Sequence, residues 1–136
     1  MSLKYNTDQH AEYLLMSERI GLCWLEIFRG DTEFYSAAYW DLLTGLWRCP
    51  GAVRKTEALG FMKAIRSPHT AGKYMEAAIR RGFAVETDNP DDARSKLVVL
   101  APDMRARLDT FLDRAITELR TSNRNVDEKG PSPKDP

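Results

Sequence analysis

Polar side chains open a helix that the sequence predicts over residues 68–81. His69, Thr70 and Lys73 face away from an apolar stripe with the spacing of an amphipathic helix. A lysine reaches a phosphate or a guanine edge, a threonine reaches a phosphate or a thymine methyl group, and a histidine donates to either kind of acceptor. These residue types at the start of a helix suit contact with the major groove of DNA.

Gly72 lies among these polar residues, although glycine destabilises a helix interior by about 1 kcal/mol relative to alanine. Two explanations are open at this point. The glycine lets the helix come close to a DNA backbone, or it lets the helix pack closely against a preceding helix, predicted over residues 56–65.

A turn-rich segment, residues 88–95, carries the second group of interest. Arg94 lies beyond an acidic turn that contains a proline, between two segments with the alternation of strands. An exposed arginine on a protruding loop suits a narrow minor groove, where the potential is most negative. Acidic side chains do not favour DNA, so we expect Asp92 to brace the loop by bonding turn amides. The alternative is a plain polar hairpin tip with an incidental arginine.

The elements that position these residues follow one another along the chain. The predicted helices span residues 11–28, 34–48, 56–65, 68–81 and 103–121. The predicted extended segments span residues 52–55, 83–87 and 96–100. Thr56 and Ser67 are the expected N-caps of their helices, and Pro68 suits a first helical position. The sequence therefore predicts a mainly α fold with a small β-hairpin, in the order of a winged helix-turn-helix.

The first predicted helix, residues 11–28, is apolar around its whole circumference. Such a helix is buried on several sides. A chain of 136 residues forms one compact domain, which hardly covers this helix alone. We therefore expect a partner chain to cover it.

The composition excludes several classes of protein. With 43% hydrophobic and 29% charged residues, the chain is not wholly disordered. No apolar run is long enough for a membrane span, and the N-terminus lacks an apolar signal core, so we expect a cytoplasmic protein without a membrane partner. Two cysteines and two histidines, without metal-ligand spacing, predict no metal site and no cofactor. No grouping typical of catalysis is present, so we expect no enzyme.

The net charge of zero hides a local excess of positive charge. Residues 54–96 contain nine Lys or Arg and six Asp or Glu, whereas residues 1–53 contain four and seven. A neutral protein can still bind nucleic acid, because phosphates contact one face of it. Ordinary fluctuation in composition is the alternative explanation.

The segment from Ser67 to Phe83, followed by Asp91 to Leu100, resembles the MarR family of bacterial transcription regulators. That family has a small polar run opening the recognition helix, then Arg-Gly, an apolar strand and an Asp-x-Arg wing. The likeness is strongest over residues 54–102.

The resemblance implies a homodimer that binds a pseudo-palindromic site in double-stranded DNA and regulates transcription. Its expected parts are an N-terminal arm (1–10), a single domain (11–121) with dimerisation helices (11–28 and 103–121) around a DNA-binding core (34–101), a recognition helix (68–81), a wing (88–95) and a disordered tail (122–136). The residues expected to contact DNA are Ser67, His69, Thr70, Lys73, Arg94 and Lys96, with Asp92 bracing the wing.

Proteins of this family often hold a small aromatic effector between the dimerisation helices and the winged domain. The residues that are candidates for lining such a pocket are Trp24, Phe28, Tyr39, Trp40 and Trp47. Aromatic residues at helical spacing also pack in cores and dimer interfaces, which is the alternative.

A second function from a different class is also open. A winged-helix module can serve as a protein-interaction or scaffold unit without strong DNA binding. The near-neutral charge and the single lysine in the first turns of the predicted recognition helix favour that alternative. Salt dependence separates the two, because binding through phosphates weakens steeply as salt rises.

Overall fold

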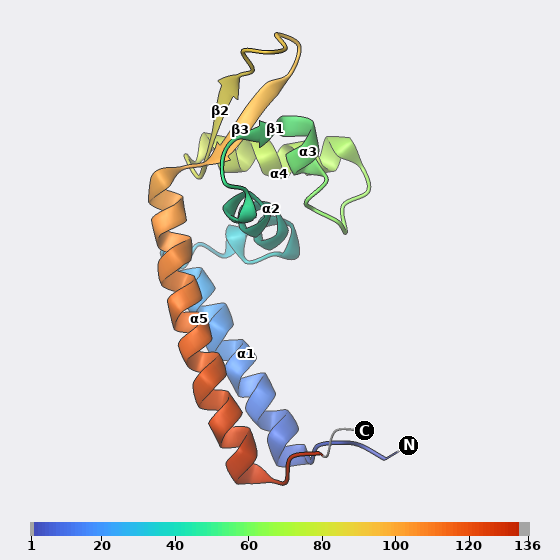
Figure 1. The fold of residues 1–136 in the computed structure, drawn as a ribbon, viewed down its shortest axis with the longest axis vertical. Helices are drawn as coiled ribbons and strands as arrows, with labels where there is room; N and C mark the ends of the chain where they lie inside the picture. Colours follow the sequence, from blue (N-terminus) through green and yellow to red (C-terminus); the bar gives the residue numbers. More distant parts are fainter. Residues whose placement is uncertain (1, 134–136) are drawn as a thin grey trace. The chain divides into compact units, whose positions relative to one another are not determined.

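The elements of the fold agree closely with the sequence signals in the middle of the chain (Figure 1). The structure is a computed structural model that describes residues 2–133. The elements are α1 (Thr7–Ile27), the 3₁₀ helix η1 (Thr32–Phe34), α2 (Ala37–Arg48), β1 (Val53–Arg54), α3 (Lys55–Leu59), α4 (Pro68–Arg80), β2 (Ala84–Asp88), β3 (Lys96–Leu100) and α5 (Pro102–Lys129). The prediction of a mainly helical fold with a small antiparallel sheet is confirmed.

The chain divides into two compact units. We call Met1–Gly30 with Thr110–Pro136 the paired-helix unit, and Asp31–Asp109 the winged unit. The division arises because α5 is 28 residues long, so that one helix contributes to both units.

The winged unit is built on a three-stranded antiparallel sheet in the order β1-β3-β2. Val53 of β1 pairs with Val98 of β3, and Ala84 of β2 pairs with Leu100 of β3. Helix α2 packs against α3, α4 and β3. The largest fully buried side chains of this unit are Phe34, Leu42, Leu43, Leu46, Met62, Met75, Val98, Met104 and Leu108. The hairpin of β2 and β3 projects from this core (Figure 1).

The start of α4 follows the predicted capping chemistry. Ser67 is the N-cap, its hydroxyl accepts a hydrogen bond from the backbone N of Thr70 at 3.3 Å, and Pro68 is the first helical residue. The predicted inner stripe comprises Ala71, Tyr74, Met75 and Ala78, of which the two alanines and Met75 are buried and Tyr74 is half-buried. The outer face of the helix is therefore fixed by local sequence.

Helix α3 is shorter than the predicted helix over residues 56–65, and Thr56 is not its N-cap. Arg54 occupies that position without a side-chain hydrogen bond, and the helix ends at Leu59. Beyond the end of α3, Met62 is buried. Phe61 lies so close to Gly45 that a Cβ added at Gly45 would be 2.6 Å from Phe61 Cδ2. The C-cap of α3 is Gly60, so a residue of low helix propensity stands where the helix ends.

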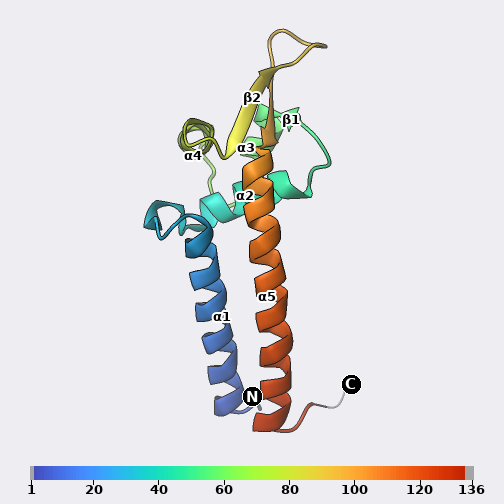
Figure 2. The same cartoon turned by 90° about the vertical axis from the view of Figure 1, so that its left-hand side faces the viewer.

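In the paired-helix unit, α1 and the later part of α5 run antiparallel, side by side (Figures 1 and 2). Asn6 bonds Lys129 at one end, and Glu26 forms an ion pair with Arg114 nearer the other. The ring of Trp24 packs edge-on against that of Phe111, with centroids 5.3 Å apart.

Residues 122–129 are helical, which corrects the expected disordered tail. Side chains before and within the first turn of α1 bond the last carbonyls of α5: Asn6 Nδ2 donates to the Lys129 carbonyl at 2.9 Å, and Gln9 Nε2 donates to the Val126 carbonyl at 3.0 Å. The expected arm over residues 1–10 is also helical from Thr7. Met1 and the tail residues 134–136 lie outside the described residues.

A carboxylate inside the paired-helix unit adds to these contacts. Glu12 is only 3% exposed, and it accepts hydrogen bonds from Lys129 Nζ at 3.1 Å and Ser122 Oγ at 3.0 Å. The bond from Lys129, together with that from Ser122, outweighs the effect of burial and lowers the pKa of Glu12 below its ordinary value. The polar composition of residues 122–129 therefore reflects specific contacts with α1.

No helix in the described range 2–133 has the length and hydropathy needed to cross a bilayer.

Candidate nucleic-acid interface

The outward face of α4 carries the polar residues that the sequence singled out. His69, Thr70 and Lys73 are exposed. His69 and Lys73 border a shallow hollow, whose lining consists of Pro68, His69, Gly72, Lys73, Glu76 and Arg80. Members of this set recur every three or four residues, so they share one face of the helix. The structure thus brings two of the predicted residues together with Glu76 and Arg80, which the sequence analysis did not single out.

Most cations between residues 54 and 96 have no ion-pair partner within the described part of the chain. The exposed, unpaired ones are Arg54, Lys63, Arg66, Lys73, Arg80 and Arg94. The paired ones are Lys55, Arg81 and Lys96. The excess of basic residues in this segment was visible in the sequence, but the identity of the unpaired ones depends on three-dimensional contacts.

Glu76, the one acidic residue lining the hollow, is neutralised from inside the winged unit. Lys55 Nζ donates to Glu76 Oε1 and to Glu86 Oε1, both at 2.6 Å. Partial burial disfavours the charged ammonium, but the bonds to the two carboxylates outweigh it and raise the pKa of Lys55. The acidic residue therefore subtracts little from the positive charge of Lys73 and Arg80.

The loop between β2 and β3 is held by its own side chains. Asp92 Oδ1 accepts a hydrogen bond from the Arg94 backbone N at 3.0 Å, which is the geometry expected of a bracing residue. Asn89, which the sequence analysis did not single out, accepts from the Asp91 backbone N at 3.0 Å and donates to Ser95 Oγ at 2.9 Å. The loop is therefore ordered by its own contacts while the Arg94 side chain is exposed.

Lys96 and Ser67 have roles inside the fold. Lys96 forms an ion pair with Asp88 across the hairpin, and the hydrogen bond that its ammonium donates to that carboxylate raises the pKa of Lys96. Ser67 uses its hydroxyl to cap α4. Both residues remain exposed, so these contacts leave them on the surface of the winged unit.

The five aromatic residues proposed for an effector pocket are distributed over both units. In the paired-helix unit, the ring of Trp24 packs against that of Phe28 at 5.0 Å. In the winged unit, Tyr39 packs against Phe34 at 4.6 Å, and Trp47 Nε1 donates to Asp109 Oδ1 at 2.8 Å. Trp40 is 41% exposed. These contacts are packing contacts within each unit, and the effector pocket stays a prediction.

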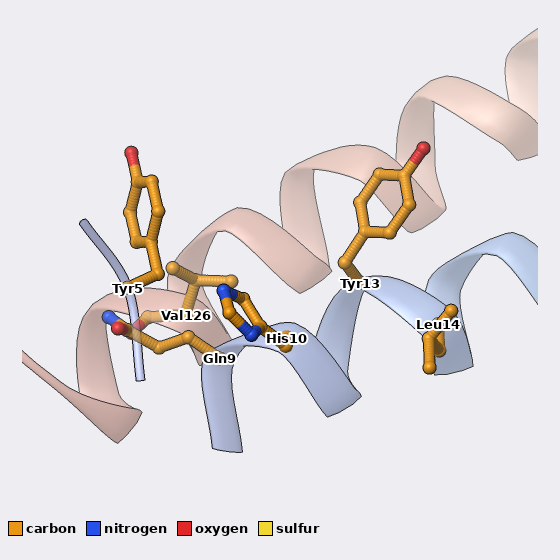
Figure 3. Close-up of a pocket in the computed structure, with 6 residues that line it drawn as sticks. All are labelled: Tyr5, Gln9, His10, Tyr13, Leu14 and Val126. Atoms are coloured by element: carbon orange, nitrogen blue, oxygen red, sulfur yellow. The ribbon is translucent and has the colours of Figure 1, made fainter. Parts of the chain in front are cut away.

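The paired-helix unit has a hollow of its own, about 460 Å³ in volume. It is lined by Tyr5, Gln9, His10, Tyr13, Leu14 and Val126. Figure 3 shows His10 and Val126 between the two tyrosine rings. The exposed large apolar side chains on α1 and α5 are Tyr13, Leu14, Leu15, Leu22, Ile116 and Leu119. The hollow of the paired-helix unit is lined mostly by apolar and aromatic side chains, whereas the hollow on the outer face of α4 is lined by several charged ones.

Comparison with known proteins gives matches in structure only. No family model and no curated protein matches the sequence. A structure described as a probable transcriptional regulator from Pseudomonas aeruginosa is 23% identical, with a TM-score of 0.55 over 81% of this chain and 78% of that one. A MarR family transcriptional regulator from Streptomyces coelicolor, crystallised with DNA, is 17% identical, with a TM-score of 0.57 over 82% and 66%.

A third structure is the transcriptional repressor CouR bound to a 23-mer DNA duplex. It is 23% identical, with a TM-score of 0.51 over 83% of this chain and 70% of that one. Structural likeness at identities this low shows the fold alone, and that fold agrees with the resemblance seen in the sequence. The chain therefore has the MarR-like winged-helix fold, which it shares with transcriptional regulators that have been crystallised on DNA.

Proposed function

We propose that the protein is a homodimeric transcription regulator that binds a pseudo-palindromic site in double-stranded DNA. In this proposal α4 enters the major groove, and the hairpin of β2 and β3 contacts the minor groove. The observation that carries it is the set of six exposed, unpaired cations between residues 54 and 96, in a unit whose fold is shared with DNA-bound regulators.

The α4 face suits a duplex for two reasons. His69, Thr70 and Lys73 lie near its N-terminal end, the part of a recognition helix that contacts base edges. Arg66 precedes the helix and Arg80 ends it, so positive charge is available on both sides of that polar group. Cations that neutralise phosphates release counterions from DNA, which favours binding.

The hairpin supplies a second contact of a different kind. The bonds made by Asn89 and Asp92 hold the loop in shape before any partner is bound. The Arg94 side chain is exposed on this ordered loop and forms no ion pair within the described chain. A cation presented in this way is attracted to the narrow minor groove of A/T-rich DNA.

The homodimer is supported by the apolar surface of the paired-helix unit. Exposed large apolar side chains that gather in one part of a protein are typical of an interaction site. The hollow beside Tyr13 and Leu14 gives that surface a concave part in which apolar side chains of a second copy can be buried. Dimerisation would supply a second α4, and the two helices would enter major grooves about one helical turn apart, or a multiple of it.

The test is fluorescence anisotropy over a series of salt concentrations, with DNA from upstream of the protein's own gene and a random duplex of equal length. We expect tight, steeply salt-dependent binding to the first duplex. Arg94→Ala should weaken it, most of all on sites with an A/T-rich flank. Arg124→Ala removes an exposed cation from the paired-helix unit and serves as the matched control.

Two outcomes would count against the proposal. Equal affinity of wild type and Arg94→Ala would remove the hairpin from the interface. Absence of binding to either duplex at low salt would favour the alternative, a winged-helix module that binds another protein through its apolar surface.

A further inference from the structure

Gly72 occupies the interior of α4 (Pro68–Arg80), where no close contact within the described chain requires a glycine. A glycine inside a helix makes the helix less stable than an alanine would. Its backbone does not require glycine, because the positive-φ glycines of the described chain are Gly30 and Gly82. Local backbone conformation therefore does not explain why a glycine occupies this position.

Packing within the described protein does not supply that reason. A Cβ added at Gly72 would meet no atom within 4 Å. Gly45 shows the opposite case, because a Cβ there would lie 2.6 Å from Phe61 Cδ2. The fold needs Gly45 and does not need Gly72, so the explanation by close packing against α3 is excluded.

Gly72 lies on the outward face of α4. It lines the hollow on the outer face of α4, with Lys73 beside it. His69 precedes it by about one helical turn, and Glu76 follows it by about one turn. An approaching surface therefore meets bare backbone at Gly72, between side chains that extend from the neighbouring turns.

We infer that Gly72 is the point at which a DNA atom lies against the backbone of α4, closer than a Cβ would allow. The inference rests on the proposed function, and it adds a steric requirement to the charged contacts. A methyl group here would hold the helix away from the duplex by up to about the length of a Cα–Cβ bond, roughly 1.5 Å. His69 and Lys73 would then lose their reach to base edges and phosphates at the same time.

The test combines stability and affinity in one variant. Gly72→Ala should raise Tm by a few degrees, because alanine is the better helix residue and finds open space. It should nevertheless weaken binding to the specific duplex by roughly tenfold, the scale of one lost base contact. Misfolding cannot cause a loss of affinity in a variant that melts at a higher temperature.

Gly51→Ala is the matched control. A Cβ at Gly51 also meets nothing within 4 Å, and this residue lies in the winged unit but outside α4. Its affinity should equal that of the wild type. A loss of affinity as large as that of Gly72→Ala would overturn the inference, because the effect would then not be specific to the α4 face.

Gly72→Lys separates the steric requirement from electrostatics. If only charge mattered at this face, an added cation would strengthen binding. We expect it to weaken binding at least as much as Gly72→Ala. Unchanged or tighter binding by either Gly72 variant would overturn the inference while the proposed function stood. Failure of the wild type to bind any duplex would instead overturn both.

Discussion

The two units of the chain differ in which polar side chains they bury and which apolar side chains they expose. In the paired-helix unit, Gln9 and Glu12 are each 3% exposed, whereas Tyr13 and Leu14 on the same helix are each 62% exposed. In the winged unit, large apolar residues such as Leu42 are fully buried, and the unpaired cations lie on the surface. Most of the exposed large apolar side chains of the described chain therefore lie in the paired-helix unit, and the unpaired cations of residues 54–96 lie in the winged unit.

This difference indicates two surfaces with different partners. An exposed apolar surface gains free energy when another apolar surface covers it. Exposed cations without partners are suited to a polyanion. In the proposed regulator, the first surface joins two copies and the second contacts DNA. Because the surfaces lie in separate units, substitutions can impair one and spare the other, which makes the comparison open to test.

Truncation after Thr121 should have the largest effect, because it removes the contacts that hold the ends of the paired helices. The lost hydrogen bonds are those of Asn6, Gln9 and Glu12 with residues 122–131. At about 1 kcal/mol for each net hydrogen bond, Tm should fall by roughly 15 °C. Circular dichroism melting measures this, with a chain ending at Pro133 as the control. An unchanged Tm would mean that these contacts do not stabilise the unit.

Leu14→Asp should dissociate the proposed dimer and leave the monomer folded. Leu14 is exposed on α1, so the substitution removes no contact from the core. In a two-fold symmetric dimer the charge is introduced twice, which should weaken association by roughly a hundredfold or more. Sedimentation velocity measures the change. Tyr35→Asp, at an exposed apolar residue of the winged unit, is the control. Equal association of the two variants would refute the assignment of this surface.

Lys73→Ala should have the smallest effect and should act on DNA binding alone. If Lys73 contacts a phosphate, affinity should fall by a similar factor on all DNA sequences. The slope of the logarithm of the binding constant against the logarithm of the salt concentration should also become shallower by about one. Anisotropy titrations at several salt concentrations measure both quantities. Lys4→Ala, which removes an exposed cation from the paired-helix unit, should change neither. A changed dimer dissociation constant in Lys73→Ala would show that the two surfaces are not independent.

The parts of the fold that the sequence predicts well have local signals. The capped start of α4 needs only Ser67 and Pro68, and the hairpin needs only alternation on both sides of a turn-rich loop. The early end of α3 was missed although Gly60, the residue at its C-cap, is a local signal. The helical residues 122–129 were missed because their contacts are with the distant helix α1.

The candidate site likewise has a part that local sequence predicts and a part that only the structure identifies. Helical spacing alone places His69 and Lys73 on an exposed face. The sequence could not show that Arg66 and Arg80 lack ion-pair partners in the described chain, because lysines and arginines nearby, such as Lys55 and Arg81, form ion pairs with carboxylates. Only the three-dimensional contacts separate cations that stabilise the fold from cations that remain available to a partner.

The hydrogen bonds between Asn6, Gln9 and the end of α5 also set an order for biosynthesis. Asn6 and its partner Lys129 are 123 residues apart, whereas the winged unit, Asp31–Asp109, is one continuous segment. On the ribosome, the winged unit can therefore fold while α1 still waits for its partner helix. The packing surface shared by α1 and α5 is complete only when translation has passed Lys129. In the proposed dimer, association through the paired-helix unit would thereby follow the folding of the winged unit.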